Sequence, residues 1–404
     1  MRFSPHFPSL PQLPDGKTIS RLAVAKLFLA LYLPMALVLT GLVYGTLRID
    51  AEIGLQALRA QEAGEVKLAG QILTHDFEEV AADLRLLSRT PALKHFLDTG
   101  SPEEKQRLTA QFLDMSQEKR HYDQIRYLDS SGMETIRVNL VDGKAEAVPG
   151  KELQNKAGRY FFSDSLRLGQ GEVYISPLDL NIEQGRIEIP HKPMLRFGTP
   201  AFDSAGEKKG VVLINYYGSE LIGNFRRAMA EKRHAMLLNR EGYWLSSPDP
   251  SQEWGFMLGL ETTFAGQYPE AWARINAADE GVLMTGQGLF THATVYPLLA
   301  GQRSATGTPS AEGASAHELS AREYYWKVVS LVPASELPSP SLTRHPGILA
   351  LYSTGMALLA LLAGFMAVTM PTRRQFRRTL AENEARLRLP DLPGTRHRPD
   401  LPRR

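Results

Sequence analysis

Two apolar stretches without any Asp, Glu, Lys or Arg, at residues 27–47 and 347–370, constrain this chain more than any polar motif. As a helix, each is long enough to cross a hydrocarbon core of about 30 Å. A helix satisfies its own backbone donors and acceptors, so it is the form in which a separate apolar segment crosses lipid. The sequence therefore predicts two transmembrane helices, at residues 22–47 and 347–370.

Basic residues flank the two stretches on the sides that face the chain ends. They are Arg2, Lys17, Arg21 and Lys26 before the first stretch, and Arg373, Arg374, Arg377 and Arg378 after the second. Because basic residues stay on the cytoplasmic side of a membrane, residues 1–21 and 371–404 are predicted to be cytoplasmic. The large intervening region, residues 48–346, is then outside, which is the layout of a receptor.

Each stretch also has an alternative interpretation. The first could be a cleaved signal peptide, but such a peptide has a short apolar region followed by a small-residue cleavage site. Here the stretch is of full membrane length and continues into a charged segment. The second could be a buried core helix, but the arginine cluster directly after it favours a membrane span.

Composition limits the possible functions. The net charge is only +2, and the basic residues gather near the membrane ends, which argues against a nucleic-acid partner. The chain has no cysteine, so thiolate catalysis, disulfides and Cys-ligated metal sites are excluded. The ten histidines are scattered without the spacing of a zinc motif. We expect neither a metal nor another cofactor.

The first part of the outside region is predicted to be helical. Residues 48–88 contain no proline, are rich in strong helix formers, and repeat apolar residues at three- and four-residue steps. Pro91 interrupts this pattern, and a capping sequence at residues 101–104 begins a further helix that ends near Lys119. We assign residues 48–119 to stalk and packing helices, which either transmit a signal or only pack against a sheet.

Beyond residue 120 the pattern changes to short strands linked by turns. Expected strands are residues 123–129, 135–140, 172–180, 194–202, 211–217, 235–239, 243–246, 281–285, 289–296 and 324–332, with helical segments at 151–168 and 269–277. Residues 300–320 are rich in Gly, Ser, Ala and Thr and are expected to form a disordered loop. The repetition predicts two antiparallel-sheet modules in tandem, at residues 120–230 and 231–340.

Several segments resemble a known family. QIRYLDSSGMETIRVN, RYFFSDSLRLGQGEVYISPLDLNIEQG and PMLRFGTPAFDSAGEKKGVVLINYYGSEL resemble the outer module of a double Cache sensor, and LLNREGYWLSS and EWGFML resemble its membrane-proximal module. The resemblance implies an α+β fold: a two-span membrane protein with a long N-terminal stalk helix and two tandem PAS-like antiparallel-sheet modules. It also implies a ligand sensor in the periplasm, anchored in the inner membrane of a bacterium, whose membrane-distal module binds the ligand.

The amino-acid-binding branch of this family uses an arginine and two aromatic residues for the ligand carboxylate, and two aspartates for its ammonium group. By position, the resemblance places Arg159 on the arginine, Phe161 and Phe162 on the aromatic pair, Asp179 on or next to the first aspartate, and Asn215 on the second. Phe162 has no hydroxyl and Asn215 has no charge. An organic acid or another small polar molecule therefore fits better than a standard α-amino acid.

The residues themselves indicate the same pocket. A guanidinium beside aromatic side chains is a common arrangement for holding a carboxylate. The expected ligand-binding residues are Arg159, Phe161, Phe162, Ser165, Tyr174, Asp179 and Asn215. Core packing is the alternative role for the two phenylalanines, and an internal salt bridge is the alternative for Arg159. Arg137 and Arg196 lie on strands among apolar neighbours, so we expect them to be structural, although either could face the cavity.

The region after the second apolar stretch resembles the linker through which such receptors enter a PAS, diguanylate cyclase or histidine kinase module. Its end, residues 389–404, is dense in Pro and Arg and contains no catalytic motif. We expect a receptor that lacks its output module in this chain, through truncation or a frameshift, and that is not itself an enzyme. A freestanding sensor that signals through a partner is the alternative.

The predicted function is that of a signal-transduction receptor module that senses a small polar ligand, an organic acid or an amino-acid-like molecule. The module is expected to act as a homodimer or as a mixed dimer with a full-length receptor. The alternative is a membrane-anchored structural or interaction protein without a small-molecule ligand. Stabilisation of the folded protein by a ligand would separate the two.

Overall fold

The computed structural model describes residues 20–183, 185–229, 234–308 and 312–387. It divides the chain into two compact units, one formed by Met1–Gly54 with Pro338–Arg404 and the other by Leu55–Leu337. Most of the predicted cytoplasmic N-terminus and the Pro/Arg-rich tail lie outside the described residues. We refer to the two units as the helical unit and the sensor unit.

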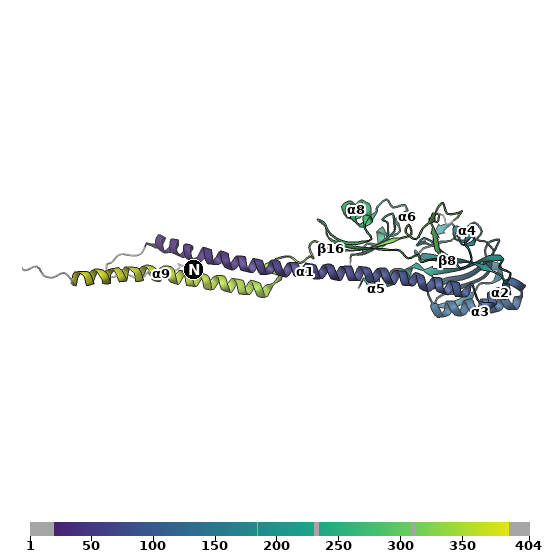
Figure 1. Ribbon diagram of the computed structural model, residues 1–404, viewed down its shortest axis with the longest axis horizontal. Coiled ribbons are helices and arrows are strands. Elements are labelled where there is room, and N and C mark those ends of the chain that lie inside the picture. Colours follow the sequence, from purple (N-terminus) through teal and green to yellow (C-terminus); the bar gives the residue numbers. More distant parts are fainter. Residues whose placement is uncertain (1–19, 184, 230–233, 309–311, 388–404) are drawn as a thin grey trace, which may run out of the picture. The chain divides into compact units, whose positions relative to one another are not determined.

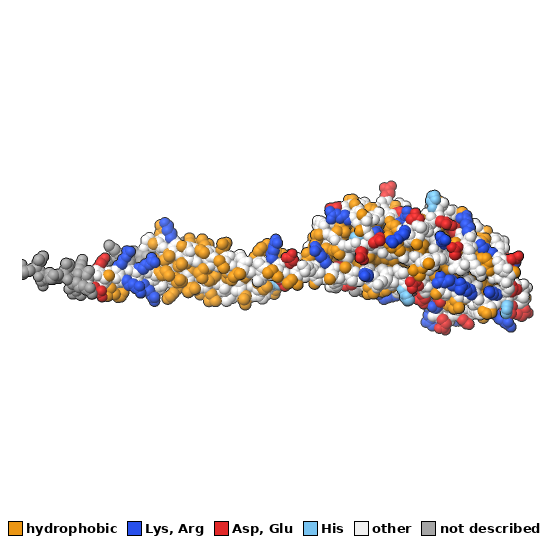
Figure 2. Space-filling view, in the orientation of Figure 1, with side chains coloured by type: hydrophobic (Ala, Val, Ile, Leu, Met, Phe, Trp, Pro, Cys, Tyr) orange, Lys and Arg blue, Asp and Glu red, His pale blue; other side chains and the backbone are white. Residues whose placement is uncertain are grey.

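The helical unit consists of the first part of α1 (Arg21–Leu87) and of α9 (Pro346–Leu387). Both helices contain a stretch that is long and apolar enough to cross a membrane, and only 6% of each such stretch is buried. Figure 2 shows hydrophobic side chains gathered at the surface of these helices. Leu37 and Leu351, for example, are 76% and 81% exposed. Exposing so large an apolar surface to water is unfavourable. Length, composition and exposure therefore all agree with the predicted membrane spans.

Three helices begin the sensor unit: the remainder of α1, then α2 (Pro91–Thr99) and α3 (Pro102–Lys119). The expected capping sequence is confirmed, because the Ser101 hydroxyl accepts a hydrogen bond from the Glu104 amide. Thr90 caps α2 in the same way. The sequence-based helix ends are confirmed to within one or two residues.

The first sheet has the strand order β15-β14-β4-β8-β9-β1-β2-β3, and β5 also pairs with β8. Its strands are β1 (Tyr122–Asp129), β2 (Glu134–Val141), β3 (Lys144–Ala147), β4 (Val173–Ile175), β5 (Asp179–Leu180), β8 (Pro193–Phe202), β9 (Lys208–Tyr217), β14 (Gln302–Ala305) and β15 (Glu318–Leu319). Between β3 and β4 lie a 3-10 turn, η1 (Gly150–Glu152), and helix α4 (Tyr160–Arg167). A small separate ribbon joins β6 (Ile182–Glu183) to β7 (Arg186–Ile187).

The second sheet follows helix α5 (Gly218–Ala228) and has the order β11-β10-β16-β13-β12. Its strands are β10 (Ala235–Leu238), β11 (Trp244–Ser246), β12 (Glu280–Met284), β13 (Gly288–Val295) and β16 (Trp326–Pro333). Helices α6 (Gly255–Leu258), α7 (Phe264–Gln267) and α8 (Pro269–Ala277) connect β11 to β12. The tandem arrangement of two antiparallel modules therefore agrees with the α+β fold that the sequence predicts.

The expected disordered loop at residues 300–320 is wrong where the structure describes it. Residues 301–319, which we call the crossover segment, follow the second-sheet strand β13 but add β14 and β15 to the first sheet. β14 runs parallel to β4, with Gln302 paired to Val173, and the buried Ser304 hydroxyl donates to the Ile175 carbonyl at 2.6 Å. A Gly/Ser-rich segment cannot form a hydrophobic core of its own. Here its backbone is ordered by hydrogen bonds to β4, a strand of the other module.

The two faces of the first sheet pack against different helices. Along β8 the residues alternate, so Leu195 and Phe197 face the helices α1–α3, and Phe77 of α1 packs edge-on against Phe197 at 5.5 Å. The opposite face carries α4 (Figure 1). There a Cβ on Gly198 would lie 2.0 Å from Ser165 Oγ, so only glycine lets α4 come this close to the sheet.

Candidate functional site

The register of the paired strands places several polar side chains on the face of the first sheet that α4 covers. Arg196 on β8 pairs with Asn215 on β9, and Asn215 pairs with Gln124 on β1. Arg126 follows two positions after Gln124 and so lies on the same face. Three neighbouring strands thus present an amide, another amide and two guanidinium groups to the helix that covers them.

The centre of this face is the ring of Phe161 on α4. The guanidinium carbons of Arg126 and Arg196 each lie 5.4 Å from the ring centroid, and that of Arg159 lies 6.0 Å from it. Each contact is a cation–π interaction. We call these four residues, Arg126, Arg159, Phe161 and Arg196, the arginine cluster.

Arg196 is only 2% exposed and is fully engaged by neighbouring side chains. Its Nη1 lies 2.7 Å from Asp179 Oδ1, its Nη2 donates to Asn181 Oδ1 at 3.1 Å, and the Tyr160 hydroxyl donates to Asp179 Oδ2 at 2.9 Å. Burial works to lower the pKa of Arg196, but the charge and hydrogen bond of Asp179, together with the nearby Tyr160 and Tyr174 hydroxyls, raise that pKa overall. Arg196 is therefore a permanent buried cation.

Arg126 is buried beside Arg196 and shares its charge with two acceptors. Its Nη2 donates to Asn215 Oδ1 at 2.6 Å, and its Nη1 lies 3.5 Å from Glu134 Oε1. Its Nε is buried and has no hydrogen-bond partner among the described residues. Burial lowers the pKa of Arg126, which the Glu134 charge opposes. A buried charged donor without a hydrogen-bond partner raises the free energy of the folded state, so a ligand that supplies an acceptor to Nε would be favoured.

Arg159 precedes α4 and borders the crossover segment. Its Nη2 donates to the Ile182 carbonyl at 2.8 Å, and its Nη1 lies 4.0 Å from Glu312 Oε1. The backbone supports this contact, because Gly313 N–H donates to the Gly158 carbonyl at 2.8 Å. Like that of Arg126, the Arg159 Nε is buried without a partner among the described residues. The alternative of an internal salt bridge is thus present only as a long contact with an exposed carboxylate.

Positive charge exceeds negative charge in this region. The buried and half-buried groups are Arg126, Arg137, Lys156, Arg159 and Arg196 against Glu134, Asp164 and Asp179, whereas Glu183 and Glu312 are exposed at the edge. Burial, together with the nearby Arg126 charge, lowers the pKa of Lys156 to about 8. Buried charges of one sign raise the free energy of the folded state unless an opposite charge pairs with them. The region is therefore suited to bind an anion.

The remaining predicted site residues lie in the packing between α4 and the sheet. Ser165 is fully buried and donates to the Phe161 carbonyl at 2.6 Å. Phe162 and Tyr174 belong to the apolar cluster under α4. Asp164, on the same helix, accepts a hydrogen bond from Ser315 of the crossover segment. These contacts are those of supporting residues, and a direct ligand role for Phe162, Ser165 or Tyr174 stays a prediction.

The sequence-based interpretation missed the central residues. Arg196 was expected to be structural, although able to face the cavity, and it does lie on the α4 face with internal partners. Arg126 and Lys156 were not singled out. Arg126 and Arg196 lie two residues from Leu128 and Gly198, which pack under α4, but the face that α4 covers is visible only in the structure. Arg137 contacts Glu134 at 2.8 Å and holds that carboxylate for Arg126, so it is closer to its expected structural role.

No other chemistry is evident in the parts of the chain that the structure describes. They contain no group of three His, Asp or Glu side chains placed to hold a metal ion. They consist of the sensor unit and the helical unit, and no catalytic domain is evident among them.

A model of the family described as "Bacterial histidine kinase, sensor domain" matches residues 73–302, more than half of the chain. The chain belongs to this family. No curated protein matches it by sequence. The match confirms the expected kinship with ligand-sensing domains of bacterial transmembrane receptors, and the sensor unit is the extracellular or periplasmic sensor domain of such a receptor.

Solved structures share the fold of the sensor domain. One is the domain of a protein described as a sensory box/GGDEF family member of Vibrio parahaemolyticus: it is 18% identical, the match covers 71% of this chain and 100% of that domain, and the TM-score is 0.58. Another is the extracellular domain of a protein described as a histidine kinase: it is 17% identical, with 71% and 95% of the two chains covered and a TM-score of 0.59. At these identities the comparison shows a common Cache-like fold.

Proposed function

We propose that this sensor domain binds a small organic anion on the α4 face of its first sheet, and that the arginine cluster holds the anion. The observation that carries the proposal is the position of three guanidinium groups within 6.0 Å of one aromatic ring, Phe161. Two of them, Arg126 and Arg159, keep a buried Nε donor without a partner among the described residues. A carboxylate offers several lone pairs to such donors and forms charge-assisted hydrogen bonds with them.

The same contacts argue for an organic acid over an α-amino acid. An ammonium group needs an accessible carboxylate, but Asp179 is already bound by Arg196 and Tyr160. At the position of the second expected aspartate stands Asn215, whose oxygen accepts from Arg126. Both candidate acceptors for an amine are therefore occupied by cations or donors of the protein itself. We infer that Asp179 and Asn215 orient the arginines and do not receive an ammonium group.

Thermal unfolding of the full chain in nanodiscs tests the proposal. The probes are succinate, its neutral analogue succinamide, and L-aspartate, each at fixed pH and ionic strength. A ligand that binds only the folded state stabilises it by about 2.7 kcal/mol at a concentration of one hundred times its Kd. We expect stabilisation by succinate, little by L-aspartate and none by succinamide. Stabilisation by L-aspartate alone would contradict the proposed ligand class, and the absence of any effect would favour a structural role.

A pair of variants locates the site. Arg159→Gln removes a charge-assisted hydrogen bond worth about 1.5–3 kcal/mol, so the Kd for succinate should rise by about ten- to a hundredfold. Arg303→Gln is the matched control, because Arg303 lies on the crossover segment and its exposed side chain forms an ion pair with the half-buried Glu172 at 3.2 Å, outside the arginine cluster. Its succinate affinity should stay unchanged. Equal affinities in both variants would place the site elsewhere.

We also propose the membrane arrangement expected from the sequence, with the sensor unit in the periplasm between two spans and with dimers as the signalling form. The support is the apolar surface of both helices and the arginines that follow the second stretch. Alkaline phosphatase fused after Gly143, in the exposed β2–β3 turn, should be active in the periplasm. Activity of a cytoplasmic reporter at the same position would contradict this arrangement.

A further inference from the structure

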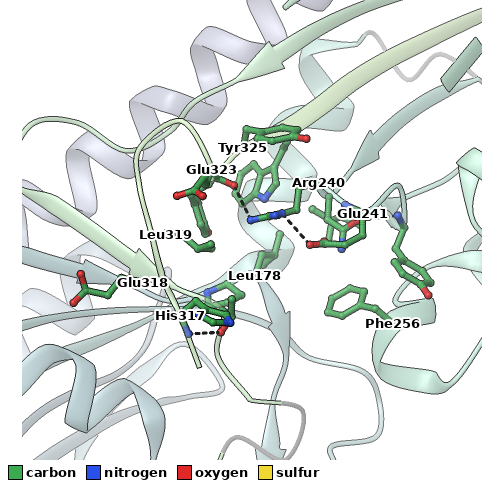
Figure 3. Close-up of a pocket in the computed structure, with 16 residues that line it drawn as sticks. Leu178, Arg240, Glu241, Phe256, His317, Glu318, Leu319, Glu323 and Tyr325 are labelled. Atoms are coloured by element: carbon green, nitrogen blue, oxygen red, sulfur yellow. Dashed lines mark hydrogen bonds and ion pairs between the residues drawn. The ribbon is translucent and has the colours of Figure 1, made fainter. Parts of the chain in front are cut away.

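A cavity of about 440 Å³ lies in the sensor unit, between its first and second sheets. Five segments line it: the β10–β11 turn with Arg240 and Glu241, the residues that lead into β16, the crossover segment up to β15, the β4–β5 connection with Leu178, and α6 with Phe256 (Figure 3). Its lining, among the described residues, shares no member with the arginine cluster. Its volume is in the range of sites for small organic molecules.

The walls of this cavity are mainly apolar and aromatic. Leu178, Leu245 and Leu319 supply aliphatic surface, and the rings of Tyr243, Phe256 and Tyr325 supply aromatic surface. Tyr243 and Phe256 lie 5.9 Å apart, centroid to centroid. Although Phe256 is a large apolar side chain, it is 37% exposed. Such a lining can bury the apolar body of a ligand and presents ring faces to a positive charge.

Acidic side chains outnumber arginines in the lining of this cavity, whereas basic side chains are in excess around the arginine cluster. Within the described part of the chain, the one guanidinium in its lining is that of Arg240, and it is already engaged. Its Nε lies 3.1 Å from Glu241 Oε1, and its Nη1 donates to the Glu323 carbonyl at 3.5 Å. The lining also contains the carboxylates of Glu241, Glu318 and Glu323. Hydrogen bonds from the Ser320 hydroxyl and amide lower the pKa of Glu323, so its charge persists at neutral pH.

We propose that this cavity is a second ligand site and that it binds an organic cation, an amine or quaternary ammonium on a short apolar body. The positive group would lie beside Glu241, where it shares or replaces the contact that Arg240 now makes. The apolar body would lie against Tyr243, Phe256 and Tyr325. A carboxylate is disfavoured here, because the lining contains three glutamates, Glu241, Glu318 and Glu323, against one guanidinium, that of Arg240, among the described residues.

Three probes with one ring and different charges test the class of ligand: benzylamine, benzyl alcohol and benzoate. Isothermal titration of the full chain in nanodiscs, at pH 7 and constant ionic strength, gives the order of their affinities. We expect benzylamine to bind most tightly. An affinity for benzyl alcohol equal to or above that for benzylamine, the same order for benzoate in the Arg159→Gln variant, or binding of none of the three, would overturn the proposal.

Variants then connect that preference to the cavity. Glu241→Gln should reduce the preference for benzylamine over benzyl alcohol by tenfold or more, since Glu241 is a surface side chain whose replacement leaves the fold intact. Tyr243→Leu removes an aromatic face and should weaken benzylamine more than benzyl alcohol. Arg159→Gln, at the other site, should leave the affinities for benzylamine and benzyl alcohol unchanged. A preference that Glu241→Gln and Tyr243→Leu both leave intact, or that Arg159→Gln abolishes, would overturn the assignment to this cavity.

Discussion

Arg196 and Asn215 lie directly opposite each other on β8 and β9, and each holds one side of the same cluster of charges. Arg196 contacts Asp179 at 2.7 Å, while Asn215 accepts a hydrogen bond from Arg126 at 2.6 Å. Because strand register fixes this pair, the sheet itself holds the guanidinium groups of Arg126 and Arg196 in place, each 5.4 Å from the centroid of the Phe161 ring. A site built this way loses little side-chain entropy when a ligand binds.

The buried pair of Arg196 and Asp179 gives the first prediction. Arg196→Met leaves the Asp179 carboxylate buried without its cation, which should cost about 3–5 kcal/mol of the free energy of unfolding. The double variant Arg196→Met/Asp179→Leu removes both charges and should recover most of that loss. Chemical denaturation of the full chain in detergent micelles measures wild type, the single variants Arg196→Met and Asp179→Leu, and the double variant. A double variant as unstable as the sum of its single variants would contradict the pairing.

Lys156 predicts how anion binding depends on pH. Its pKa in the folded protein is lowered to about 8, so raising the pH from 7 to 9 removes one positive charge beside the arginine cluster. Succinate affinity should therefore fall over this interval, and it should change less in Lys156→Gln. The exposed Lys151→Gln serves as the control and should behave like the wild type. A pH dependence that persists unchanged in Lys156→Gln would exclude this lysine as the cause.

The same lysine affects stability with a definite sign. Between its folded pKa of about 8 and its ordinary value of 10.5, the unfolded chain binds more protons at Lys156 than the folded chain does. The contribution of Lys156 to the free energy of unfolding therefore increases as the pH rises through that interval. Comparing wild type with Lys156→Gln at pH 7.5 and pH 9.5 isolates this contribution, since the other titrating groups are common to both proteins. A difference that stays constant, or that changes in the opposite direction, would contradict the assignment.

Close packing of α4 on the first sheet gives a further prediction. A Cβ on Gly198 would lie 2.0 Å from Ser165 Oγ, so Gly198→Ala should destabilise the sensor unit by about 1–3 kcal/mol through overpacking. Adding Ser165→Gly removes the nearest obstructing atoms and should recover part of the loss. Gly158→Ala is the control, because a Cβ at that position would have open space within 4 Å. Thermal unfolding midpoints of wild type, of Gly198→Ala, Ser165→Gly and Gly158→Ala, and of the double variant would reveal the coupling, and equal effects of Gly198→Ala with and without Ser165 would argue against it.

Local patterns predicted the elements of this fold well. The helix ends at Lys119 and Ala277, and most strands to within a few residues, follow from capping residues, alternation and turns, which act over a few neighbouring positions. The crossover segment was missed because its order depends on hydrogen bonds to β4, a strand more than a hundred residues earlier. No short-range pattern in a Gly/Ser-rich sequence carries that information.

The residues of the candidate site divide in the same way, into those that a local sequence pattern predicts and those that depend on the pairing of distant strands. Arg159, Phe161 and Asp179 could be named because they match a family pattern within one stretch of sequence. Arg126 and Arg196 reach the same ring only through the register of β1, β9 and β8, and the sequence alone does not show which strands are neighbours. An arginine between apolar strand residues fits either an internal ion pair or a ligand site. Arg196 is both a partner of Asp179 and a neighbour of the site, so the two interpretations were not exclusive.

Glu312 on the crossover segment gives the last prediction, because it is an internal competitor for the proposed anion. Its carboxylate lies 4.0 Å from Arg159 Nη1 and is mostly exposed, so the contact is worth little and can exchange with a ligand carboxylate. Glu312→Gln should therefore tighten succinate binding by about two- to fivefold, since exposed ion pairs contribute up to about 1 kcal/mol. Glu318→Gln, also exposed on the crossover segment, changes the net charge equally but should not alter the Kd. Equal gains in both variants would mean that general electrostatics, and not competition at Arg159, sets the affinity.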